Sequence, residues 1–246
     1  MIDLKMGTQP NDETCGPTCL HAVYQYHGLN ISLEKIISTT EKSLSGGTLA
    51  PLLGKHALEH GFKATIYVNN MNLFDPTWFD KSEAHPEMLL TKLKHQAQFK
   101  HEKNFSRASL AFQEFLELGG NIRFKTLDVD TLKKYFDKNL PIITGLSATY
   151  LYRTPRESFT SDGVSFFDDI SGTPCGHFVV LCGYNNKKRL IVVADPYRKN
   201  AFTNDNYYMV SSKRLINAIL LGVTTYDANS LIIEPSENAK TQGNRI

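Results

Sequence analysis

The 246 residues include 27 lysines and arginines and 25 aspartates and glutamates, a formal net charge of +2, which is far from the basic balance of most nucleic-acid-binding proteins. With 41% hydrophobic and 21% charged residues, the composition is globular and excludes wholesale disorder. No apolar run reaches signal-peptide length at the amino terminus or the roughly 20 residues of a membrane span, so we expect a cytoplasmic protein without membrane or nucleic-acid partners.

The first predicted helix covers residues 15–27. Thr14 is a plausible N-cap, Pro17 lies in the first turn, and Gly28 is a typical helix stop. One face of this helix gathers the residues suited to a core, namely Leu20, Val23, Tyr24 and His27. The helix therefore has a packing role that is independent of any chemistry.

The next segments predict a short helix at 32–37 and a loop, helix and strand unit at 46–68, in which Gly61 ends the helix. Two further helical patterns make up an elaboration at about 71–120, which ends at Gly119 and Gly120.

A strand is then predicted at 121–127, a helix at 130–140 capped by Asp130, and a buried strand at 141–148. An irregular stretch rich in Tyr, Phe and Asp follows at about 149–173. Core packing explains the aromatic residues of this stretch at least as well as a role in substrate binding. Four of them are nevertheless candidates to line a substrate cleft: Tyr150, Tyr152, Phe166 and Phe167.

The last third predicts strands at 176–184 and 189–197, joined as a hairpin through Asn185 and Asn186. Shorter strands at 207–210 and 230–235 flank a helix at 211–221. Because helices come first and an antiparallel sheet comes later, the order favours an α+β fold. We expect one domain over 1–246 with a disordered tail at about 236–246.

Four cysteines are too few for a disulfide framework in a chain of this length, so free thiols are expected. Cys15 lies at the predicted start of the first helix, where the positive end of the helix dipole stabilises a thiolate. A cysteine at a helix start is more often a packed residue than a nucleophile. The assignment therefore depends on partner residues elsewhere in the chain.

A cysteine nucleophile needs an imidazole base, and that imidazole needs an orienting side chain. His177 begins an otherwise apolar strand, and Asp195 lies in the next strand of the predicted hairpin, so the two side chains can face each other. The backbone N–H of Cys15 and the side-chain amide of Gln9 are candidate donors to the oxyanion. These four residues form the predicted catalytic set.

Four separated blocks carry a family resemblance: QPNDETCGPTCLHAVYQYHG, GGTLAPLLGKHALEHGF, GHFVVLCGY and ADPY. In this order they resemble the bacteriocin-processing, double-glycine leader peptidases and their stand-alone relatives, a branch of the papain-like cysteine peptidases. The resemblance implies a papain-like fold, with Cys15 as nucleophile, His177 as general base and acid, Asp195 as its orienting residue and Gln9 as oxyanion donor.

The implied reaction is hydrolysis of a peptide or protein substrate through a thioester, with neither a cofactor nor a metal. Leader-cleaving members are usually fused to an export transporter, and this sequence has no membrane segment or nucleotide-binding motif. A bacteriocin leader is therefore not assumed as the substrate. The elaboration at 71–120 and the stretch at 149–173 are where specificity is expected to diverge.

Three alternatives use the same residues. A deamidase or an acyl transferase would share the thioester, and a non-catalytic binding module would keep only the fold. A Cys₃His zinc site would use Cys15, Cys19, Cys175 and His177, although these spacings are not common zinc patterns. Cys19 and Cys182 are otherwise expected to pack in the core.

Overall fold

The computed structural model describes residues 1–43, 46–160 and 164–236, so the predicted tail lies outside the described residues except for Ser236. The helices are α1 (Cys15–Tyr26), α2 (Leu33–Thr39), α3 (Ala50–Glu59), α4 (Pro86–Gln96), α5 (Lys103–Glu117), α6 (Val129–Phe136), α7 (Ala148–Tyr152) and α8 (Ser212–Leu221), with 3₁₀ turns η1 (Pro76–Trp78) and η2 (Gly222–Thr225). The strands are β1 (Phe62–Val68), β2 (Asn121–Phe124), β3 (Ile142–Ser147), β4 (Glu157–Phe159), β5 (Ser165–Phe167), β6 (Gly176–Asn185), β7 (Leu190–Ala194), β8 (Tyr207–Ser211) and β9 (Asn229–Pro235).

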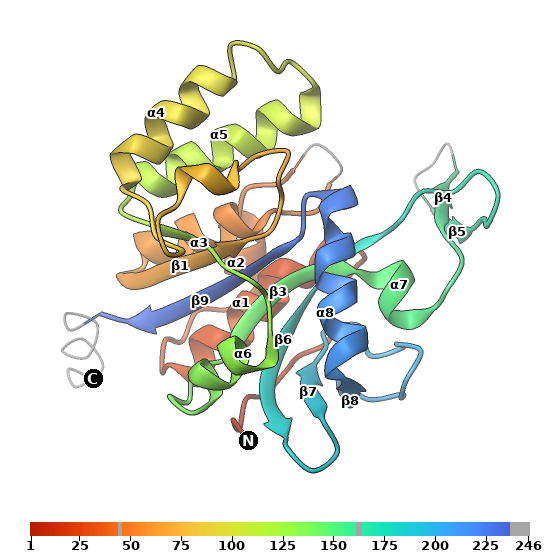
Figure 1. Cartoon of the computed structure of the whole chain (residues 1–246). Coiled ribbons are helices and arrows are strands. Elements are labelled where there is room, and N and C mark those ends of the chain that lie inside the picture. Colours follow the sequence, from red (N-terminus) through yellow and green to blue (C-terminus); the bar gives the residue numbers. More distant parts are fainter. Residues whose placement is uncertain (44–45, 161–163, 237–246) are drawn as a thin grey trace.

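A seven-stranded sheet with the order β2-β1-β9-β3-β6-β7-β8 organises the molecule (Figure 1). Its pairs are antiparallel except for β1 with β2, so the predicted α+β class with a mainly antiparallel sheet is confirmed. The predicted order, with the helices first and the sheet later, is wrong. Strands β1 and β2 come between helices in the first half of the chain and belong to the same sheet as the later strands. The last strand, β9, inserts between β1 and β3.

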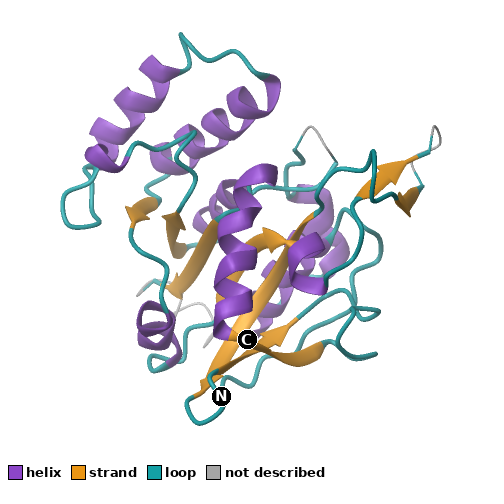
Figure 2. Cartoon of the chain, turned by 45° about the vertical axis from the view of Figure 1, so that its right-hand side comes forward, coloured by secondary structure: helices purple, strands orange, loops and turns teal. Residues whose placement is uncertain are grey.

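Helices lie on both sides of this sheet (Figure 2). Along β6, Phe178 and Val180 belong to the core cluster that includes α1, α3 and α5, whereas Val179 and Leu181 belong to the cluster that includes α8. Burial on both faces explains why β6 reads as a continuous apolar run instead of an alternating pattern.

The helical elaboration at 71–120 forms α4 and α5, which lie together away from the β4–β5 hairpin in Figure 1. Phe112 and Phe115 of α5 are buried in the same cluster as α1 and α3. A Cβ on Gly54 of α3 would lie 2.6 Å from the Phe115 ring, so a glycine permits this close packing. The elaboration therefore contributes to the main core.

Several boundaries follow the predictions and others need correction. Helix α1 ends one residue before the predicted end, and Gly28 beyond it adopts φ +84°. The cap of α6 is Asp128, whose carboxylate accepts from the Thr131 N–H at 2.7 Å, so the assignment of Asp130 as the cap is wrong. Asp130 instead lies in the first helical turn.

Regular structure occurs in the described parts of the stretch predicted as irregular, residues 149–160 and 164–173. This stretch holds most of α7 and the two-stranded sheet β4–β5, which projects from the body of the molecule (Figure 1). The strands are only three residues long, and their apolar side chains Phe159 and Phe167 are more than half exposed. Strands this short, with no buried face, give no clear period-2 pattern in the sequence.

Candidate active site

Cys15 is the first residue of α1, and its side chain is largely buried. Thr14 occupies the N-cap position but makes no side-chain cap hydrogen bond; its hydroxyl instead donates to the Asn11 carbonyl at 3.0 Å and accepts from the Asn11 N–H at 3.3 Å. A Cβ on Gly16 would lie 2.4 Å from Cγ2 of Thr48, so the glycine after Cys15 lets the helix start close to the segment before α3. The backbone N–H groups of Cys15 and Gly16 lie in the first helical turn and have no intrahelical acceptor, whereas Pro17 has no N–H.

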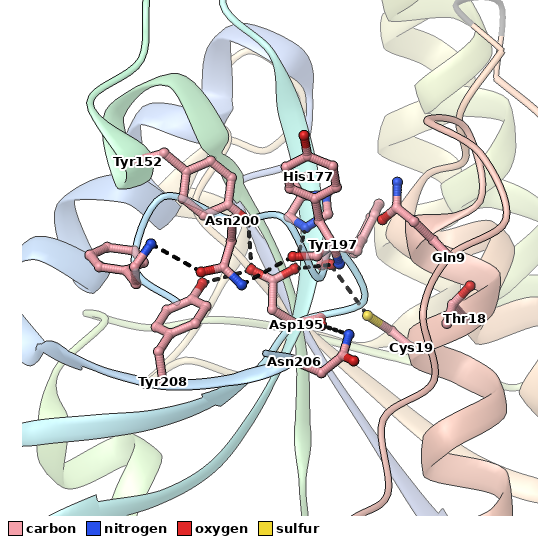
Figure 3. Close-up of polar contacts among 12 residues, drawn as sticks. Gln9, Thr18, Cys19, Tyr152, His177, Asp195, Tyr197, Asn200, Asn206 and Tyr208 are labelled. Atoms are coloured by element: carbon pink, nitrogen blue, oxygen red, sulfur yellow. Dashed lines mark hydrogen bonds and ion pairs between the residues drawn. The ribbon is translucent and has the colours of Figure 1, made fainter. Parts of the chain in front are cut away.

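His177 and Asp195 meet at the ends of neighbouring strands. His177 is the second residue of β6, and Asp195 follows directly after β7, its antiparallel partner. The distance between Nε2 of His177 and Oδ1 of Asp195 is 2.9 Å, and both side chains are buried (Figure 3). The predicted hairpin therefore brings these two residues into contact.

The Asp195 carboxylate accepts three more hydrogen bonds, none of them predicted from the sequence. The hydroxyls of Tyr152 and Tyr208 donate to Oδ2 at 2.6 and 2.8 Å, and the backbone N–H of Tyr197 donates to Oδ1 at 2.8 Å (Figure 3). The backbone of Asp195 is fixed as well, because Asn206 donates its side-chain amide to the Asp195 carbonyl at 2.6 Å. A completely buried carboxylate with four donors is held in one orientation.

The charges of this pair depend on each other. Burial would lower the pKa of His177, but the Asp195 carboxylate, followed by the Cys15 side chain, raises it to about 10. Burial would raise the pKa of Asp195, but the His177 charge and the hydrogen bonds from His177 and Tyr152 hold it below its usual value. An imidazolium and a carboxylate are therefore the favoured forms at neutral pH.

The second ring nitrogen of His177, Nδ1, is not bound by Asp195. Because Asp195 binds Nε2, Nδ1 is the ring nitrogen that remains for Cys15, whose side chain is among the causes of the raised His177 pKa. The ring is also flanked by Tyr152 and Tyr197, whose centroids lie 6.1 and 6.4 Å from its own. This arrangement links a thiol at a helix N-terminus, an oriented imidazole and a buried carboxylate.

Gln9 lies at the same site, on the side facing α1 (Figure 3). Its backbone N–H donates to the Pro196 carbonyl at 2.9 Å, which ties the segment before α1 to the residue after Asp195. One amide N–H of its side chain donates to the Asn11 carbonyl at 2.9 Å. A carboxamide has two N–H groups, so a second donor remains.

Two cavities meet at Cys175 and Gly176. One has a volume of about 440 Å³ and is lined by Gln9, His177 and Tyr197 among others. The other, of about 300 Å³, is lined by Cys15 and Phe178. Residues of the β4–β5 hairpin line both cavities, whereas residues 71–120 line neither, so of the two segments expected to control specificity only the hairpin region borders this site.

Phe166 and Phe167 of the hairpin and Tyr152 of α7 line the first cavity, whereas Tyr150 lines a separate one. The expectation of an aromatic cleft lining is therefore met by three of the four predicted residues.

The remaining cysteines have other environments. Cys19 is completely buried, its thiol donates to the Phe178 carbonyl at 3.3 Å, and burial raises its pKa. Cys182 is buried in the core, where burial raises its pKa to about 12. Within the part of the chain that the structure describes, no three His, Cys, Asp or Glu side chains are grouped as metal ligands, so the zinc alternative lacks a ligand set.

A helix-borne cysteine beside an imidazole that a carboxylate orients is the arrangement of a cysteine peptidase. A model of the peptidase C39 like family matches residues 1–215. The chain belongs to this family and is a cysteine peptidase, and the deamidase, acyl transferase and binding-module alternatives find no support. No curated protein matches the chain significantly.

Three solved structures are similar at low identity. The C39-like peptidase from Bacillus anthracis is 16% identical with a TM-score of 0.42, and the match covers 94% of each chain. The peptidase domain of Streptococcus ComA is 14% identical, with a TM-score of 0.44 and coverage of 95% and 99%. Xylellain, a cysteine protease from Xylella fastidiosa, is 14% identical, with a TM-score of 0.43 and coverage of 96% and 85%. Across the described residues, no helix is long and apolar enough to cross a bilayer.

Proposed function

We propose that this cysteine peptidase hydrolyses a peptide or protein substrate with Cys15 as the nucleophile, His177 as general base and acid, and Asp195 as the residue that orients His177. The observation that carries this proposal is the buried contact of 2.9 Å through which Asp195 holds one nitrogen of the His177 ring. Nε2 binds Asp195, which leaves Nδ1 for Cys15.

The reaction begins with attack of the Cys15 sulfur on the carbonyl carbon of the scissile bond. The oxyanion of the tetrahedral intermediate accepts from the backbone N–H of Cys15 and from the second amide N–H of Gln9. When the intermediate collapses, the C–N bond breaks and His177 gives its Nδ1 proton to the leaving amine. The acyl group is left on Cys15 as a thioester.

Water completes the cycle. His177, now neutral at Nδ1, takes a proton from a water molecule as that water attacks the thioester carbonyl. The C–S bond then breaks, which releases the carboxylic acid and returns the thiolate of Cys15. The Asp195 carboxylate keeps the imidazole in one orientation through both proton transfers, because its four donors fix its position.

Selective alkylation tests the assignment of the nucleophile. We expect iodoacetamide to modify Cys15 at least about tenfold faster than any of the other cysteines, because a thiolate is the reactive form and burial disfavours it at Cys19, Cys175 and Cys182. Peptide mapping by mass spectrometry identifies the site. Faster modification of another cysteine in the folded protein would refute the assignment.

A further inference from the structure

Provided that the proposed function holds, the reaction determines which part of the substrate lies in each of the two cavities. His177 protonates the leaving amine, so the part of the substrate after the scissile bond lies in the cavity that His177 lines. The acyl part stays on Cys15 and lies in the cavity that Cys15 lines and His177 does not. We name this second cavity, lined by Cys15, Leu49, Glu157, Phe159, Phe178 and Asp227, the acyl-side cavity.

The charged lining of the acyl-side cavity is entirely acidic. Its carboxyl groups are Asp12, Glu13, Glu157 and Asp227, and no lysine or arginine is among the described residues that line it. This concentration of acid is local, since the chain as a whole has a net charge of +2. The cavity that His177 lines, which we name the leaving-side cavity, differs because Lys199 lines it together with Asp12 and Glu157.

Three of these carboxylates have no cationic partner among the described residues. Glu13 forms an ion pair with Lys42 at 2.8 Å, but Asp12, Glu157 and Asp227 form none. The His177 charge acts on Glu157 and Asp227, but its imidazole is hydrogen-bonded to Asp195. Among the described residues, the acyl-side cavity therefore holds three carboxyl groups that no lysine or arginine of its lining pairs with.

Asp227 is the most buried of the three, with 7% of its surface exposed. A Cβ on Gly176 would meet its Oδ2 and the hydroxyl of Thr225, so the absence of a side chain at Gly176 leaves room for this carboxyl group at the cavity wall. Burial raises the pKa of Asp227 to about 7, against the opposing effects of the Thr225 side chain and the His177 charge. Burial also raises the pKa of Glu157. A cation beside these groups would remove the cost of ionising them.

The rest of the lining suits a long side chain with a charged end. Leu49, Phe159 and Phe178 provide apolar surface in the same cavity. Lysine and arginine combine a flexible apolar stem with a cationic head, so the stem would contact these residues while the head meets the carboxylates. A glutamate side chain would meet these acidic groups and, among the described lining residues, no lysine or arginine to pair with.

We propose that the acyl-side cavity selects a lysine or arginine on the amino-terminal side of the scissile bond. Asp227 and Glu157 bind the cationic head, and Asp12 adds attraction from the exposed rim of the cavity. The substrate is accordingly a peptide or protein segment with a basic residue one or two positions before the bond that is cut.

Peptidyl acyloxymethyl ketones test this proposal on the full-length protein, because they alkylate the active-site thiol without requiring turnover. One set has the sequence X-Gly before the reactive group and the other Gly-X, where X is Arg, Lys, Gln or Glu. In at least one set, we expect the Arg and Lys probes to label Cys15 about tenfold or more faster than the Gln probe, the size of one charge-assisted hydrogen bond. The Glu probe is expected to be the slowest.

Matched variants locate the source of the preference. Asp227→Asn and Asp12→Asn should each lower the Arg-to-Gln rate ratio, whereas Asp130→Asn, an exposed carboxylate of α6 that lines neither cavity, should leave it unchanged. Asp12 is exposed, so its variant remains informative if the buried Asp227 variant does not fold.

Equal rates with Arg, Gln and Glu probes in both sets, or a ratio that neither variant lowers, would overturn the proposed selectivity and leave the peptidase assignment standing. If Cys15 reacts with no probe while another cysteine does, the proposed function fails and the selectivity proposal fails with it.

Discussion

Replacing Cys15 by alanine is expected to reduce peptide hydrolysis by at least about 10⁴-fold, the scale seen when the nucleophile of a catalytic triad is removed. The reason is that the thioester cannot form, while the remaining donors only bind and polarise the substrate. Hydrolysis is measured by mass spectrometry of a peptide mixture incubated with each purified variant.

Cys19→Ala is the matched control for Cys15→Ala. Cys19 lies one turn further along α1, and its thiol donates to the Phe178 carbonyl in the core. Its loss should cost about 1 kcal/mol or more of stability, mainly through a small cavity, while Cys15 still supports hydrolysis. If Cys15→Ala kept full turnover, or if only Cys19→Ala lost it, the assignment of the nucleophile would be wrong.

Asp195→Ala is expected to have the second largest effect, and it acts on stability as well as on activity. Removing the carboxylate leaves the buried His177 imidazolium without its counter-ion and the hydroxyls of Tyr152 and Tyr208 without their acceptor. Breaking a buried ion pair in this way costs about 3–5 kcal/mol in the free energy of unfolding. Hydrolysis by the folded fraction should fall by about 10²-fold or more, because the imidazole loses its orientation.

Urea denaturation followed by circular dichroism gives the free energy of unfolding for this comparison. Tyr208→Phe is the control, because it removes one donor to Asp195 and keeps the ring; it should cost only about 0.5–1.5 kcal/mol. Equal stabilities of Asp195→Ala and the unmodified protein would mean that the His177–Asp195 pair is not the buried, mutually dependent pair described above.

The first helix and the β6–β7 hairpin could be predicted because their signals are local. Leu20, Val23 and Tyr24 repeat with helical spacing and are completely buried, and Gly28 adopts the left-handed conformation that ends a helix. The apolar run before Tyr184 and the polar turn after it predict a hairpin without any knowledge of the rest of the sheet.

The surroundings of Asp195 could not be predicted in the same way. Tyr152 lies 43 residues before it in the chain, and no spacing rule relates α7 to the end of β7. Tyr208 reaches Asp195 only because β8 pairs with β7. The same limit applies to Asp227, which comes close to Gly176 because the strand after it, β9, inserts between β1 and β3.

Two nearby aspartates that could each cap the helix explain the error at the N-cap of α6. Asp128 and Asp130 are both good N-cap residues, and the sequence around them does not favour one over the other. The structure starts the helix at Val129, so Asp128 caps it and Asp130 lies near the positive end of the helix dipole.

Capture of the acyl-enzyme tests the central claim most directly. The protein is mixed with a peptide ester, which acylates a thiol faster than a peptide does, and is quenched in acid within the first turnover for intact-mass measurement and peptide mapping. The proposed mechanism predicts an added acyl mass on Cys15 that disappears on longer incubation and is absent from Cys15→Ala. Hydrolysis that proceeds with the acyl group on another residue would contradict it.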